Sequence, residues 1–121
     1  MMPHWIAKFR YAIQGVTHAL RSHSSFAVHV PVAAVVILLA VWLQLEAWRW
    51  AALLICIGMV LALELINTAI EMLVHVLHPG RDPRIGRVLD LAAAAVLVAA
   101  ITAAIVGLIV LLPPLWEKVQ P

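Results

Sequence analysis

The chain has 121 residues, of which 65% are hydrophobic and 12% are charged, and its formal net charge is +2. Because a soluble domain of this length cannot bury so much apolar surface, the composition excludes a soluble globular protein and predicts one small integral membrane domain over residues 1–121. The few basic residues cluster at the ends of apolar segments, which is typical of membrane topology signals, so we expect no nucleic-acid partner.

Residues 5–22 are predicted to form an amphipathic helix on the membrane surface. Apolar side chains recur there at helical spacing, and most basic and polar side chains lie between them. The apolar set is Trp5, Ile6, Phe9, Ile13, Val16 and Leu20. No signal peptide with a small-residue cleavage site precedes the first apolar run, so we expect this helix to be retained.

Three apolar segments follow, and each is long enough to cross a bilayer. They cover residues 29–45, 50–77 and 86–112. The second is expected to end at His78-Pro79-Gly80 and the third at Pro113-Pro114, because proline and glycine interrupt helices. The sequence therefore predicts an all-α fold with one surface helix and three membrane-spanning helices.

The basic residues at the segment ends indicate an orientation. Six of them fall on one side of a three-span arrangement and two on the other: Lys8, Arg10, Arg21, Arg81, Arg84 and Arg87 against Arg49 and Lys118. Since cytoplasmic loops carry an excess of lysine and arginine, the N-terminus is expected to be cytoplasmic.

The second span carries three polar side chains on one face. Glu64, Asn67 and Glu71 fall within roughly 60° of one another on an α-helix. An ionisable side chain in hydrocarbon costs about 2.5 kcal/mol or more, so such groups usually face protein and mark a pathway or a reaction site. The alternative is a polar seam that only joins helices, and the same acids would also suit a proton or metal pathway.

The surroundings of this face favour phosphoryl transfer. Glu71, Asp90 and the basic loop at residues 81–84 lie near the cytoplasmic side, where carboxylate oxygens suit a magnesium nucleotide. Glu64 lies about two turns deeper, where a lipid hydroxyl would arrive and a carboxylate could act as general base. No glycine-rich nucleotide loop occurs, which excludes a soluble kinase fold.

Residues 64–71, with the sequence ELINTAIE, resemble the signature of the small prokaryotic diacylglycerol kinase family, which includes the undecaprenol kinases. Three further segments match in order. They are Arg10-Tyr11-Ala12 with Gly15, Phe26-Ala27-Val28-His29, and Asp90-Leu91-Ala92-Ala93. The resemblance covers about residues 8–112.

The resemblance implies a homotrimer of three-span subunits in the bacterial plasma (inner) membrane. It implies transfer of the ATP γ-phosphate, with Mg²⁺, to a membrane lipid alcohol, either diacylglycerol or undecaprenol. By matching position, it makes Glu64 the catalytic base and Asn67 its supporting group. It makes Glu71 a magnesium and nucleotide ligand, and it places Tyr11, Arg81 and Asp90 at the nucleotide.

Two positions depart from the family pattern. Leu89 stands where the family usually has a lysine, and His23 stands where it usually has an acidic metal ligand. His23 is the candidate metal ligand there, although histidine prefers softer ions than Mg²⁺. Arg81, Arg84 or Arg87 would supply the missing cation. The alternative is a divergent, non-catalytic relative that acts as a small helical assembly or accessory protein.

Overall fold

A computed structural model describes residues 3–22 and 25–121 of the chain. The described residues form four helices in chain order: α1 (His4–Ser22), α2 (Phe26–Leu43), α3 (Ala47–Leu77) and α4 (Pro83–Val119). By length and composition, α2, α3 and α4 are each able to cross a membrane. The predicted all-α fold with three spans is confirmed.

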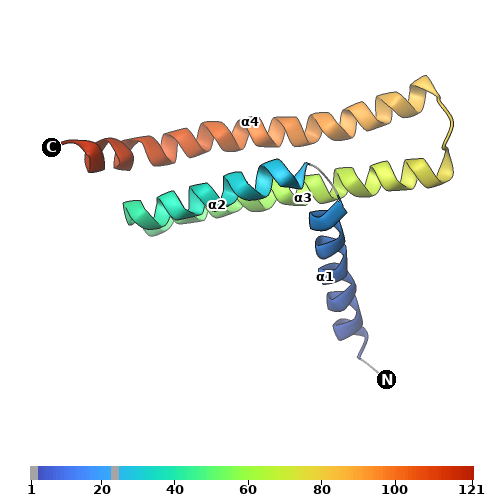
Figure 1. Ribbon diagram of the computed structural model, residues 1–121, viewed down its shortest axis with the longest axis horizontal. Coiled ribbons are helices and arrows are strands. Elements are labelled where there is room, and N and C mark those ends of the chain that lie inside the picture. Colours follow the sequence, from blue (N-terminus) through green and yellow to red (C-terminus); the bar gives the residue numbers. More distant parts are fainter. Residues whose placement is uncertain (1–2, 23–24) are drawn as a thin grey trace.

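The helices form an open bundle with one helix set crosswise. The two longest helices, α3 and α4, pack against each other as an antiparallel hairpin, and α2 lies along only part of it. Figure 1 shows α1 leaving the bundle sideways near the start of α2, while the loop end of the α3–α4 hairpin extends well past that point. The hairpin end therefore stands beyond the three-helix part of the structure.

The connection between α2 and α3 is a tight turn. Gln44 adopts the left-handed conformation, with φ of 52°. The backbone N–H of Gln44 donates to the carbonyl of Val41, and that of Leu45 donates to the carbonyl of Ala40. These two bonds close the last turn of α2 in the way usual for helices that end in a left-handed residue.

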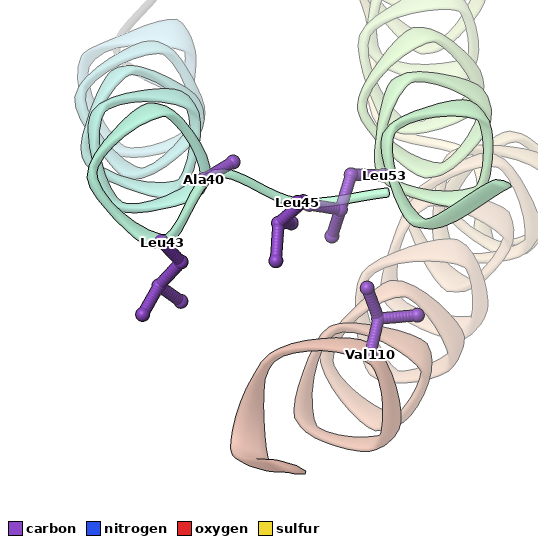
Figure 2. Packing of buried hydrophobic residues seen from close by; sticks show 5 residues of the cluster. All are labelled: Ala40, Leu43, Leu45, Leu53 and Val110. Atoms are coloured by element: carbon purple, nitrogen blue, oxygen red, sulfur yellow. The ribbon is translucent and has the colours of Figure 1, made fainter. Parts of the chain in front are cut away.

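The main hydrophobic cluster lies at this turn. Figure 2 shows its five buried residues, which are Ala40, Leu43, Leu45, Leu53 and Val110. Leu45 and Leu53 lie together in the view, and Val110 points toward them from α4. The cluster fixes one end of the bundle, at the opposite end of α2 from α1.

The predicted end of the third span at residue 112 is wrong as a helix end, because α4 continues through Pro113-Pro114 to Val119. Pro114 has no N–H, so the carbonyl of Val110 loses the partner that a regular helix would give it. The guanidinium Nη1 of Arg49 donates to that carbonyl instead. A side chain from the start of α3 thus satisfies the helix at the point where proline would interrupt it.

The three spans also begin three residues earlier than predicted, at Phe26, Ala47 and Pro83. The last of these starts is well defined by its cap. Asp82 precedes α4 and accepts a hydrogen bond from the backbone N–H of Arg84, with Pro83 in the first helical position. Both features favour a helix start, since proline there sacrifices no hydrogen bond.

Candidate functional site

Glu64 is the most deeply buried charged residue in the described chain, with 2% of its surface exposed. It lies on the face of α3 that meets the first turn of α2. There the Nε2 atom of His29 is 3.6 Å from Oε2 of Glu64. That oxygen accepts no hydrogen bond from any described residue. The site therefore holds a buried carboxylate next to a histidine.

The polar face continues along α3 toward the loop and becomes exposed. Asn67 and Thr68 are buried, whereas Glu71 is exposed. The side-chain amide of Asn67 donates to Oε1 of Glu71 at 3.0 Å. Asn67 is thus directed toward Glu71, whereas the family resemblance implied that it supports Glu64.

Asp90 joins Glu71 at the loop end of the hairpin. Glu71 precedes the end of α3 by six residues and Asp90 follows the start of α4 by seven, so both stand roughly 10 Å from the loop along antiparallel helices. Both side chains are exposed, and so is Arg81 in the loop between the helices. The structure brings these three predicted nucleotide-site residues to one end of the molecule.

Arg84 is engaged by Asp82. Its guanidinium lies 2.9 Å from Oδ2 of Asp82, and its backbone N–H bonds to Oδ1. Two hydrogen bonds hold the pKa of the Asp82 carboxyl below its ordinary value. The one from the Arg84 side chain has the larger effect, and the one from the Arg84 backbone N–H has the smaller. Of the three arginines that could replace the family's lysine, Arg84 is the one with an ion-pair partner among the described residues.

Other predicted residues are not brought to this end. Tyr11 lies on α1, is 67% exposed, and leaves the bundle with that helix. His23 lies outside the described residues. Within the described part of the chain, no group of three or more His, Cys, Asp or Glu side chains is placed to hold a metal ion. Leu89 is half-buried.

An apolar groove of about 420 Å³ opens beside His29, between α2, α3 and α4. His29 is the one polar side chain among its lining residues, which also include Val36, Val60, Ala104 and Leu111. Sequence reasoning missed both the groove and the pairing of His29 with Glu64. The available signal was a histidine in the first turn of an apolar span. Once the turn at residues 44–46 brings α2 and α3 side by side, this histidine lies at about the same level along the bundle as Glu64.

Comparison with known proteins identifies relatives of this chain. The sequence model of the prokaryotic diacylglycerol kinases matches residues 10–111. A diacylglycerol kinase of Synechocystis is 40% identical over 114 residues, which are 93% of this chain and 65% of that protein. The chain thus spans a little less than two thirds of the length of that relative.

An undecaprenol kinase of Bacillus subtilis is 33% identical over 107 residues, which are 88% of this chain and 87% of that protein. The family model matches most of the chain, and the matched range includes the polar face of α3, the hairpin loop and the start of α4. On these grounds, the chain belongs to the prokaryotic diacylglycerol kinase family.

Proposed function

We propose that this protein is an ATP-dependent kinase that phosphorylates a membrane lipid alcohol, diacylglycerol or undecaprenol, at the cytoplasmic side of the bacterial inner membrane. The observation that carries the proposal is the buried carboxylate of Glu64, which lies 3.6 Å from His29, a residue that lines an apolar groove. Family membership and the names of the two relatives support the same reaction.

The proposed chemistry divides between the two ends of the polar face. Glu64 accepts the proton of the lipid hydroxyl, whose oxygen forms a bond to the γ-phosphorus of ATP while the bond from that phosphorus to the bridging oxygen of ADP breaks. The apolar groove beside His29 suits an alcohol that carries hydrocarbon. Catalysis of this kind rests on positioning and charge stabilisation, so a few groups on a helical scaffold suffice.

Glu71 would hold Mg²⁺ together with the nucleotide. Its side chain is exposed, and Asn67 occupies Oε1, which leaves Oε2 free. Magnesium is commonly bound by one or two carboxylates, with phosphate oxygens and water completing its shell, so a single carboxylate without a full protein cage fits it. When bound, the ion neutralises phosphate charge.

The remaining nucleotide contacts come from the hairpin end. Asp90 and Arg81 stand there with Glu71, and Tyr11 would join them from the α1 helix of a neighbouring subunit in a homotrimer. Arg81 or Arg87 would take the role of the family's lysine, because Arg84 is held by Asp82. An arginine contacts two phosphate oxygens at once, which a lysine does not.

Phosphate transfer from labelled ATP tests the proposal. Purified protein in mixed micelles with Mg²⁺ is given diacylglycerol or undecaprenol, and labelled lipid phosphate is measured. We expect transfer to one of them in the wild type and loss of at least about 100-fold in Glu64→Gln, which removes the base. Glu117→Gln, an exposed glutamate at the far end of α4, is the matched control.

Two outcomes would contradict the proposal. Transfer that survives in Glu64→Gln would remove the base assignment. Absence of transfer to both lipids, with the protein folded and oligomeric, would favour the non-catalytic alternative and would make Leu89 and His23 marks of lost chemistry.

A further inference from the structure

His29 occupies a junction between two features of the site. Its imidazole lines the apolar groove, and its Nε2 is 3.6 Å from the free oxygen of Glu64. Only 23% of the histidine side chain and 3% of the glutamate side chain are exposed. The distance between the two atoms is within ion-pair range and slightly beyond a hydrogen bond.

The surroundings of Glu64 make this neighbour important. A buried carboxylate needs a hydrogen-bond donor or an opposite charge beside it. A general base must also be held within reach of the proton that it accepts. Asn67, the nearest buried amide on the same face, donates to Glu71. His29 is the ion-pair partner that the described part of the chain gives Glu64.

We propose that His29 is a positioning residue for the lipid kinase: its Nε2–H donates to Oε2 of Glu64, holds the carboxylate in place and leaves Oε1 for the proton of the lipid hydroxyl. The inference rests on the proposed function. Catalytic hydrogen bonds are often long in a protein without its substrates and shorten when these bind, so a closure of about half an ångström is sufficient.

The competing explanation is that His29 only fills space between the two helices. The two explanations predict opposite rankings of two substitutions. Glutamine keeps an N–H donor at similar reach, whereas leucine fills an apolar groove better and donates nothing. A space-filling residue would tolerate leucine at least as well as glutamine.

The test measures kcat and KM for the lipid in wild type, His29→Gln and His29→Leu, with saturating magnesium ATP in mixed micelles. We expect His29→Gln to keep kcat within about tenfold, and His29→Leu to lose about 100-fold in kcat with KM changed by less than about threefold. His4→Gln and His4→Leu are matched controls at an exposed histidine of α1. A kcat for leucine equal to or above that for glutamine would overturn the inference.

The outcomes separate this inference from the proposed function. If the wild type transfers phosphate and His29→Leu is unimpaired, the role of His29 is contradicted but the kinase function is not. A wild type that transfers no phosphate contradicts the kinase, and with it any role for His29 in that reaction.

Discussion

Glu64 and Glu71 lie two helical turns apart on one face of α3, yet their surroundings differ. Glu64 is buried beside a histidine that lines an apolar groove, while Glu71 is exposed and holds the amide of Asn67. Burial favours proton transfer by removing competing water, and exposure favours binding a hydrated ion with its phosphates. The same residue type is thus suited to two roles by depth alone.

Glu71→Gln should weaken binding of magnesium ATP by at least about tenfold, because it removes a charged oxygen ligand. Glu64→Gln should leave that affinity nearly unchanged, since Glu64 stands about 10 Å further along the helix. Titration of a fluorescent ATP analogue with and without Mg²⁺ measures both. A Glu71→Gln protein that binds as tightly as wild type would remove the ligand role from this residue.

The start of α4 shows how a short element positions the loop end of the site. Asp82 caps the helix through the backbone N–H of Arg84 and also binds the Arg84 side chain. Both hydrogen bonds stabilise the charged carboxylate, so the pKa of Asp82 in the folded protein is below its ordinary value of 3.8. The cap therefore fixes the start of α4, the helix that carries Arg87 and Asp90.

Acid should loosen this cap. A lowered pKa in the folded state means that the stabilisation is fully present above pH 3.8 and is lost as the pH falls through the folded value. Hydrogen exchange at residues 84–87, corrected for the intrinsic pH effect, should accelerate over that acid range in wild type. Asp82→Asn keeps a capping oxygen without the titration, so the same acceleration in this variant would refute the assignment.

The elements differ in how far the sequence alone predicts them. The length of the apolar segments, the break at residues 45–50 and the helix-ending residues 78–80 predict three spans, and the spacing of Glu64, Asn67 and Glu71 predicts a polar face, because these are local properties of the chain. The continuation of α4 through Pro113-Pro114 is not local. It depends on Arg49, which is 61 residues from Val110 in sequence.

The pairing of His29 with Glu64 is a long-range contact of the same kind. It joins two helices whose relative height is set by the turn at residues 44–46 and by the packing around Leu45 and Leu53. Spacing within one helix carries no information about such a contact. The orientation of the spans, by contrast, was predicted from charge and stays a prediction.

At the scale of the whole molecule, one chain exposes more surface than a compact soluble protein of its mass. Its accessible surface is 9006 Å², whereas a compact soluble monomer of 13.2 kDa would expose about 6,400 Å². Apolar side chains cover the outer faces of all four helices. Lipid covers such faces in a membrane protein, and subunit packing in the proposed trimer would cover part of them.

Subunit mixing tests whether the site is shared within that trimer. Tyr11 lies on α1, which leaves its own bundle sideways, so the proposed nucleotide contact of Tyr11 is with the α3–α4 hairpin of a neighbour. Tyr11→Ala and Glu64→Gln should each be nearly inactive alone. Unfolding and refolding them together in equal amounts should restore about one quarter of wild-type activity, because that fraction of shared sites draws an intact Tyr11 and an intact Glu64 from different chains.

Glu64→Gln refolded with an equal amount of a Glu64→Gln, Tyr11→Ala double variant is the control, since no intact Glu64 is present in that mixture. A site built within one chain predicts a different result: the activity of each mixture would equal the mean activity of its two variants. Restoration in the first mixture and none in the control would show that α1 of one subunit completes the nucleotide site of the next.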